Sequence, residues 1–206
     1  MKKYCSNCIY ETLPNKEVTL KESDILFLET DTLEYVYKIV EGLIKITKLH
    51  QSGDEKVFDI LGPNDYVALL AVLQGDEEYI ATATALTDVT VRRFSKKDVE
   101  QAYSSNAMFQ TNCMKCVVTR SKTFHNYLFN VSNVDPEEKI LSVLQLLANK
   151  FGRVENDIVY VTLPFSKTVL ANIIGVRRET LSRKLSSMKK DNILEENHNV
   201  YKFNRL

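Results

Sequence analysis

Several features that mark large classes of protein are missing from this sequence. Its 206 residues include no Trp, six Gly, four Pro and four Cys, and they contain no long apolar run. A helix that spans a bilayer needs about 20 predominantly apolar residues, so no membrane segment is expected. The stretch MKKYCSNCIYETLPNKEV lacks the apolar core and cleavage site of a signal peptide, and we therefore expect a cytoplasmic protein.

Recognisable catalytic patterns are also missing. No Ser-His-Asp grouping, glycine-rich phosphate loop or pair of catalytic carboxylates stands out. The histidines at 50, 125 and 198 show no ligand-like spacing to one another, which gives haem sensing little support. We therefore predict that the protein is not an enzyme.

Charge is balanced over the whole chain but not along it. The 27 Lys and Arg match the 27 Asp and Glu, so the molecule as a whole offers no general attraction to polyanions. Residues 166–206, however, carry nine Lys or Arg against four Asp or Glu. A basic C-terminal module joined to an acidic N-terminal one is a footprint expected of nucleic-acid binding.

Residues 25–94 are predicted to form β-strands. Short β-favouring runs are separated by turns around Gly53, Gly62 and Gly75; the runs are ILFLE, EYVYKIV, LIKITKL, KVFDIL, YIATATAL and VTVRRF. Several of them alternate between apolar and polar residues. This spacing is typical of an antiparallel barrel or sandwich, and we predict an all-β N-terminal domain.

Helical patterns follow this domain. Ser95 is a plausible N-cap for SKKDVEQAYS, and residues 107–131 contain neither Gly nor Pro. Side chains recur along this long segment at spacings of four and three, at Cys113, Val117, Arg120, Phe124, Tyr127 and Val131. The stripe suits packing on its own domain or pairing with a second copy, and we predict a homodimer with Val117, Arg120, Phe124, Tyr127 and Val131 in the seam.

A further helix and two strands are expected near the C-terminus. Asp135 and Pro136 begin the helix, while residues 157–161 and NVYKFNRL read as strands. The predicted divisions are an N-terminal arm and sensor domain at 1–106, a dimerisation helix at 107–133 and a DNA-binding domain at 134–206.

The stretches SKTVLANIIGV and GVRRETLSRKLSSMKK together predict a helix-turn-helix. Ser166 can cap the first helix, and Gly175 permits a sharp turn before the second. Leu181, Leu185 and Met188 recur at helical spacing and are predicted to form the buried stripe of the second helix.

The opposite face of that second helix carries residue types suited to base edges. Arg can donate two hydrogen bonds to guanine, Glu can accept one from cytosine, and Ser can do either. The predicted base-reading residues are Arg178, Glu179, Ser182 and Arg183, and the predicted phosphate contacts are Ser166, Lys167, Arg177, Thr180 and Lys184. The helix would lie in a major groove. A solvated cationic face on an ordinary bundle is the simpler alternative.

GVRRETLSRKL, with the order of strands, long helix and helix-turn-helix, resembles the Crp/Fnr superfamily of bacterial transcription regulators over nearly the whole chain. LGPNDY resembles the family's LGPGD turn, and Gly42 falls where a strand-joining glycine is usual. The resemblance implies an α+β fold: an N-terminal antiparallel, cupin-like β-roll, a long dimerisation helix and a C-terminal winged helix-turn-helix. It also implies a homodimer on a two-fold symmetric DNA site, and RNA polymerase as a partner of an activator.

Within the superfamily, Glu179, Ser182 and Arg183 resemble the Fnr branch, whose members read TTGA…TCAA half-sites. Arg178 is more like the Crp branch. The sequence departs from the family at Arg177, where a capping Ser is frequent, and at Lys184, where an apolar residue is frequent.

Cyclic AMP is not expected as the effector. A cyclic-nucleotide-binding member would carry Gly-Glu-Leu and Arg-Ser in its phosphate pocket, whereas this chain has Val67, Ala68 and Leu69 at the first position and Ile80 and Ala81 at the second. No positive charge remains there to neutralise a buried phosphate.

The four cysteines form two CxxC pairs, Cys5 with Cys8 and Cys113 with Cys116. The resemblance to the Fnr branch implies a 4Fe-4S cluster, although that branch uses three N-terminal ligands and one later one. A zinc-Cys₄ site and a dithiol/disulfide switch are alternatives. In a further alternative the cysteines only pack, and the regulator answers an unidentified small molecule or is constitutively active. A remote alternative is an interaction adaptor that does not bind DNA.

Overall fold

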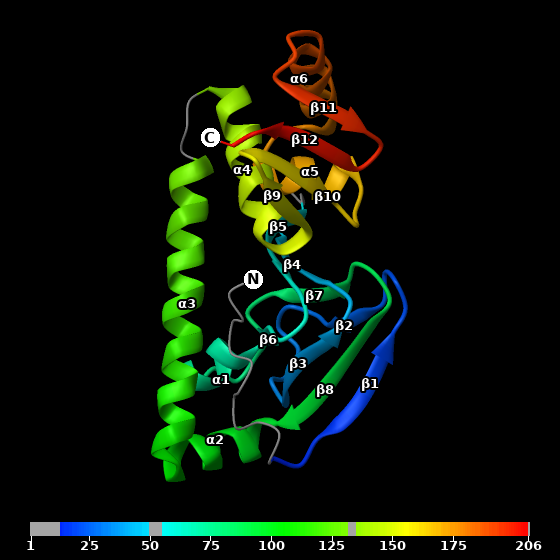
Figure 1. Ribbon diagram of the computed structural model, residues 1–206. Coiled ribbons are helices and arrows are strands. Elements are labelled where there is room, and N and C mark those ends of the chain that lie inside the picture. Colours follow the sequence, from blue (N-terminus) through cyan, green and yellow to red (C-terminus); the bar gives the residue numbers. More distant parts are fainter. Residues whose placement is uncertain (1–12, 50–54, 132–134, 206) are drawn as a thin grey trace. The chain divides into compact units, whose positions relative to one another are not determined.

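The computed structural model describes residues 13–49, 55–131 and 135–205. The chain divides into two compact units, residues 2–121 and residues 122–206, and the division falls inside one long helix. The elements confirm the expected α+β class (Figure 1), with a β-roll, a long helix and a winged helix-turn-helix in chain order. Among the described residues, none of the helices combines the length and apolar character needed to cross a bilayer.

The first unit is built on two four-stranded sheets in which every paired strand is antiparallel. One sheet has the order β1 (Lys16–Leu20), β8 (Val89–Ser95), β3 (Tyr35–Glu41) and β6 (Tyr66–Val67). The other has the order β2 (Ile25–Phe27), β7 (Thr82–Ala85), β4 (Ile44–Leu49) and β5 (Glu55–Leu61). Inward side chains of both sheets share one core, which includes Val36, Ile39, Ile44, Ala83 and Val91. In β7 every second side chain is buried in this core, as alternation along a strand requires, whereas in β3 four consecutive residues, 36–39, are buried.

The strand runs recognised in the sequence correspond to β2, β3, β4, β5, β7 and β8. The sequence reading missed β1, β6 and the short helix α1 (Leu69–Gln74). Strand β1 lies at a sheet edge, so its sequence KEVTL carries little apolar signal. Helix α1 is only six residues long and begins after Ala68, whose φ of 66° is unusual for a residue with a side chain.

Two helices follow the β-roll in the positions expected from their caps. Helix α2 (Lys96–Ser105) begins at Ser95, whose Oγ accepts a hydrogen bond from the Asp98 backbone N–H at 3.1 Å, as predicted. Helix α3 (Ala107–Val131) begins at Asn106, whose side-chain oxygen accepts from the Met108 and Phe109 N–H groups at 3.0 and 3.1 Å.

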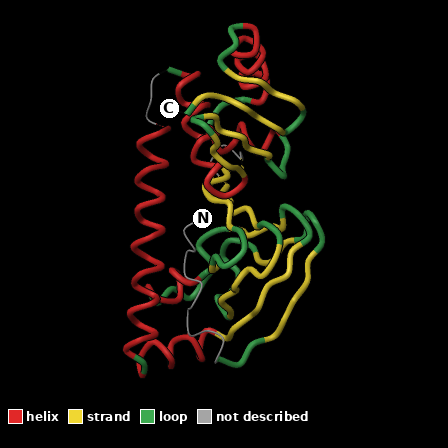
Figure 2. The backbone as a smooth tube through the Cα atoms, in the orientation of Figure 1, coloured by secondary structure: helices red, strands yellow, loops and turns green. Residues whose placement is uncertain are grey.

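The second unit contains three helices and a four-stranded antiparallel sheet. Its helices are α4 (Pro136–Phe151), α5 (Lys167–Ile174) and α6 (Arg178–Lys190). The sheet has the order β11 (Leu194–Asn197), β12 (Val200–Asn204), β10 (Ile158–Thr162) and β9 (Gly152–Glu155). The strands are drawn in yellow in Figure 2. Asp135 caps α4 by accepting from the Glu137 N–H at 2.8 Å, and Pro136 opens the helix as predicted. The hairpin of β11 and β12 is the wing that follows the helix-turn-helix.

Candidate nucleic-acid interface

The turn between α5 and α6 has the geometry that the sequence predicted. Ser166 caps α5, and its Oγ accepts from the Val169 N–H at 3.5 Å. Gly175 ends the helix with a φ of 80°, and its N–H donates to the Ala171 carbonyl at 2.9 Å. A Cβ at Gly175 would meet nothing nearer than Lys139 Nζ at 4.0 Å, so the backbone conformation rather than a lack of space favours glycine here.

Helix α6 separates a buried apolar stripe from an exposed polar face. Leu181, Leu185 and Met188 are fully buried, which confirms the predicted stripe. On other faces of the helix, three of the four predicted base-reading residues, Arg178, Glu179 and Arg183, are exposed, and the fourth, Ser182, is half-buried. Two positively charged side chains and one carboxylate are therefore available to a ligand near the start of the helix. Their role in reading bases stays a prediction.

The predicted phosphate-contacting residues fall into two groups. Ser166 and Arg177 are exposed beside the starts of α5 and α6, and the Arg177 side chain does not cap α6. Lys184 instead faces α4, where its Nζ lies 3.3 Å from Glu137 Oε1. This ion pair explains how a lysine occupies a position where an apolar residue is frequent in the family. In the unbound protein Lys184 helps to hold α6 on α4.

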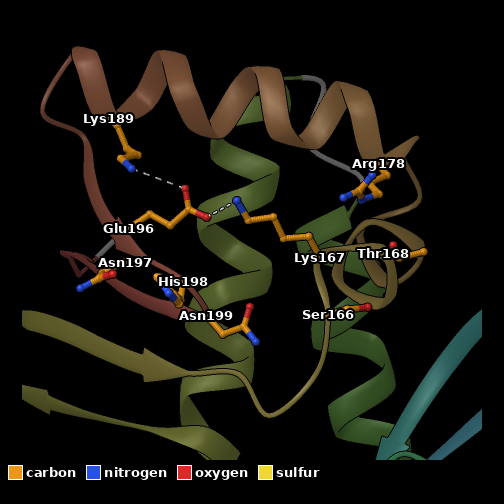
Figure 3. A pocket seen from close by; sticks show the side chains of 9 residues that line it. All are labelled: Ser166, Lys167, Thr168, Arg178, Lys189, Glu196, Asn197, His198 and Asn199. Carbon is orange, nitrogen blue, oxygen red and sulfur yellow. Dashed lines mark ion pairs between the residues drawn. The ribbon is translucent and has the colours of Figure 1, made fainter. Parts of the chain in front are cut away.

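A pocket of about 650 Å³ lies between α5, α6 and the wing (Figure 3). Its lining residues come from three short segments: Ser166, Lys167 and Thr168 at the start of α5; Arg178 and Lys189 at the two ends of α6; and Glu196, Asn197, His198 and Asn199 in the wing. Sequence reasoning did not identify the wing residues. The run EENHN at residues 195–199 was the available signal, but nothing local shows that it folds back onto α5.

Two of the charged side chains that line this pocket surround Glu196. Its side chain is only 7% exposed, and its carboxylate lies near Lys167 and Lys189. Burial, and secondly the negative charge of Glu196, raise the pKa of the buried Tyr201 hydroxyl to about 12. The Tyr201 hydroxyl is therefore neutral at any physiological pH.

One face of α3 packs on the β-roll of its own unit. Phe109, Cys113 and Cys116 are buried on this face. Further along, Arg120 Nη2 lies 2.6 Å from Asp59 Oδ2 on β5, and its Nη1 donates to the Tyr66 carbonyl at 3.0 Å. The sequence placed Cys113 and Arg120 on a dimer seam, whereas the structure turns both toward the β-roll. A heptad-like spacing cannot show which of two neighbouring stripes meets which partner.

The structure describes the side chains of two further predicted seam residues. Val117 is half-buried and Phe124 is exposed, while the side chains of Tyr127 and Val131 lie outside the described part of the structure. Exposed apolar side chains on α3 include Met114, Val118, Phe124 and Leu128. Successive members of this set are four, six and four residues apart along the helix.

The cysteine sets are only partly described. Cys113 and Cys116 lie one turn apart on the buried face of α3, and Cys116 is disulfide-bonded. Cys5 and Cys8 lie outside the described residues. Within residues 13–49, 55–131 and 135–205 there is no group of three or more side chains able to hold a metal ion. The described chain therefore supplies two sulfur atoms of the four that an iron–sulfur or zinc-Cys₄ site would use.

The segments that correspond to a cyclic-nucleotide pocket are apolar. Val67 and Leu69 are buried on either side of Ala68, and Ala81 is buried beside the exposed Ile80. In the same unit, Phe27 stacks on Tyr79 with ring centroids 3.7 Å apart. None of these five residues carries a charged side chain, and the expectation that cAMP is not the effector stays a prediction.

The fold and the exposed recognition helix define a winged helix-turn-helix protein that carries a β-roll of the cyclic-nucleotide-binding type. Residues 17–106 match the family model of the cyclic nucleotide-binding domain, and residues 138–204 match that of the Crp-like helix-turn-helix domain. The chain therefore belongs to the Crp/Fnr family of DNA-binding transcription regulators, which are not enzymes.

Similar proteins include a nitrogen regulator and an anaerobic regulator. The global nitrogen regulator of Synechocystis sp. is 23% identical over 89% of this chain and 82% of its own length. The anaerobic regulatory protein of Bacillus subtilis is 24% identical over 92% of this chain and 80% of its own. The solved structure of FixK2 from Bradyrhizobium japonicum covers 94% of each chain with a TM-score of 0.78 and 19% identity.

Proposed function

We propose that this protein is a homodimeric, sequence-specific transcription regulator that binds a two-fold symmetric DNA site through α6 and answers a redox signal through its cysteines rather than cAMP. The proposal that the protein binds DNA rests on the two faces of α6. Arg178, Glu179 and Arg183 are exposed, whereas the apolar stripe of the same helix is fully buried. Such a helix presents its N-terminal side chains to base edges in a major groove.

The proposed half-site is TTGA, paired with TCAA across the dimer axis. Its support is the combination of Glu179, Ser182 and Arg183 on one side of α6. Selection of bound fragments from a random duplex pool, with and without oxygen, tests both the sequence and the signal. A binder that contacts several phosphates should also lose affinity steeply as salt rises. Binding without salt dependence would instead support the adaptor alternative, and an unchanged preference in Glu179→Ala would remove the basis for TTGA.

The homodimer is proposed to form along exposed apolar side chains of α3. Phe124→Asp combined with Leu128→Asp is expected to weaken dimerisation about 100-fold, because carboxylates would face one another across an apolar seam. Sedimentation equilibrium measures this change. Asn126→Asp, also on the exposed part of α3, adds a negative charge off the proposed seam and should leave the dimer intact. Equal weakening by both variants would contradict the proposed seam.

The signal is proposed to act on Cys116. Two thiols lose two protons and two electrons to an oxidant such as molecular oxygen, and a disulfide bond forms between them. The expected partner of Cys116 is Cys5 or Cys8, so that the bond ties the N-terminal arm to α3. Support comes from the disulfide-bonded state of Cys116 and from its place on the face of α3 that also carries Arg120. A sulfur atom in a disulfide is not available as a thiolate ligand.

Thiol mapping and metal analysis on anaerobically purified protein test this signal. We expect no stoichiometric iron or zinc, and two fewer alkylatable thiols after exposure to oxygen. Cys116→Ser should abolish the loss of thiols, whereas Cys113→Ser should not. Stoichiometric iron with a visible absorption band would establish a cluster, and stoichiometric zinc would establish a zinc site; either would overturn the disulfide proposal.

If DNA binding is the same in oxidised and reduced protein, the regulator responds to a small molecule instead or is constitutively active. An activating role would add contacts with RNA polymerase.

A further inference from the structure

Glu196 occupies an unusual place for an acidic residue in a DNA-binding unit. It lies on β11 of the wing, with Lys167 Nζ 2.5 Å from its Oε1 and Lys189 Nζ 3.9 Å from its Oε2 (Figure 3). The carboxylate side chain is 7% exposed, while the two lysine side chains are 33% and 46% exposed. Among the residues that line the pocket, only Glu196 is acidic.

The contact is one of charge more than of directed hydrogen bonding. Oε1 of Glu196 is buried and accepts no hydrogen bond of good geometry from a described residue, although Lys167 Nζ lies close to it. A buried carboxylate is costly unless cations compensate it, and here two lysines from different helices do so. The same negative charge contributes to the raised pKa of Tyr201. The lysines therefore face inward, toward the wing, in the unbound protein.

We propose that Glu196 is a built-in counter-anion that competes with DNA phosphates for Lys167 and Lys189. The proposal rests on the DNA-binding function proposed above and concerns how that same surface meets the phosphate backbone. Ser166 and Lys167 line the pocket at the start of α5. Arg178, itself a predicted base-reading residue, lines it at the start of α6. A phosphate that approaches these groups meets cations that Glu196 already neutralises in part.

The consequence is a lowered affinity that does not depend on base sequence. Phosphate contacts fix position and add affinity but carry no sequence information. Each additional phosphate neutralised changes the slope of log K against log salt concentration by about −0.9. Removing the competing carboxylate should therefore strengthen specific and non-specific binding together, and more strongly at low salt.

The test compares Glu196→Gln with Glu195→Gln in the full-length protein. Glu195 is adjacent on the same strand, is exposed, and pairs with Lys202 at 2.7 Å. Both variants therefore remove one carboxylate, but Glu195→Gln releases one lysine and Glu196→Gln releases two. Fluorescence anisotropy is measured on the selected duplex and on a scrambled duplex between 50 and 200 mM KCl. We expect Glu196→Gln to bind both duplexes about 3- to 10-fold more tightly at 50 mM, with the slope more negative by about 0.9 to 1.8. Glu195→Gln should change affinity less than about twofold.

The outcomes separate this proposal from the one on which it rests. If the wild-type protein binds no duplex, the DNA-binding proposal fails. If the wild type binds but Glu196→Gln binds less tightly than the wild type, or no differently from Glu195→Gln, the counter-anion proposal alone is overturned. A second comparison guards against misfolding: with Lys167→Gln and Lys189→Gln already present, the added Glu196→Gln change should no longer tighten binding. Persistent tightening in that background would also overturn the proposal.

Discussion

Gly42→Ala is expected to lower the free energy of unfolding by more than about 4 kcal/mol, whereas Gly75→Ala is expected to lower it by only about 1 kcal/mol. Both glycines have left-handed backbones, with φ of 82° and 87°. They differ in their surroundings. A Cβ at Gly42 would lie 2.1 Å from the Asp88 carbonyl oxygen and 2.9 Å from the Val89 Cα and Cγ2, while a Cβ at Gly75 has no atom within 4 Å.

Comparison of the two variants separates the cost of a left-handed backbone from the cost of steric crowding. The turn between β3 and β4 passes directly over the turn between β7 and β8, and backbone atoms there cannot move without displacing a strand of the core. The cost of Gly42→Ala should therefore exceed about 4 kcal/mol, near the upper end of single-residue effects. Urea denaturation followed by circular dichroism measures both variants. Similar losses in the two would show that the left-handed conformation, not the close approach, makes Gly42 necessary.

Much of the fold could be predicted because its signals are local. The structure confirms Ser95 and Ser166 as N-caps, and Asp135, predicted to begin a helix with Pro136, also caps it. The buried stripe of α6 follows from helical spacing alone, since Leu181 and Leu185 repeat at one turn. Alternation in the run that forms β7 is likewise present in the structure, because one face of the sheet must pack on the core.

The parts that could not be predicted depend on contacts between distant residues. Arg120 meets Asp59 and the Tyr66 carbonyl, which lie 61 and 54 residues away in the sequence. No spacing within α3 shows that this arginine turns to the β-roll. Nothing in the local sequence distinguishes Glu196 from other acidic residues, and only the folding of the wing brings it to Lys167. Strand β1 was missed for a related reason, since an edge strand buries too few side chains to show a clear pattern.

Arg183→Ala is expected to lower affinity for the selected DNA site by about 1–3 kcal/mol, or about 5- to 150-fold, and to relax the preference at one base pair. Arg183 is exposed on α6, one turn after Glu179, and forms no ion pair with any described residue. If it reads a base edge, its guanidinium therefore has no ion pair with a described residue to break first. Affinity for a scrambled duplex should fall much less.

Arg183→Lys and Lys190→Ala distinguish base reading from simple charge. Lysine keeps the positive charge but cannot supply the planar pair of donors that recognises guanine, so Arg183→Lys should lose sequence preference while the salt slope stays unchanged. Lys190 is exposed at the far end of α6, and Lys190→Ala should weaken both duplexes alike and make the slope less negative by at most about 0.9. Competition anisotropy with single-base variants of the site measures the preference. If Arg183→Lys retained the wild-type preference, Arg183 would act on the phosphate backbone, and the reading of bases would have to come from Arg178, Glu179 and Ser182.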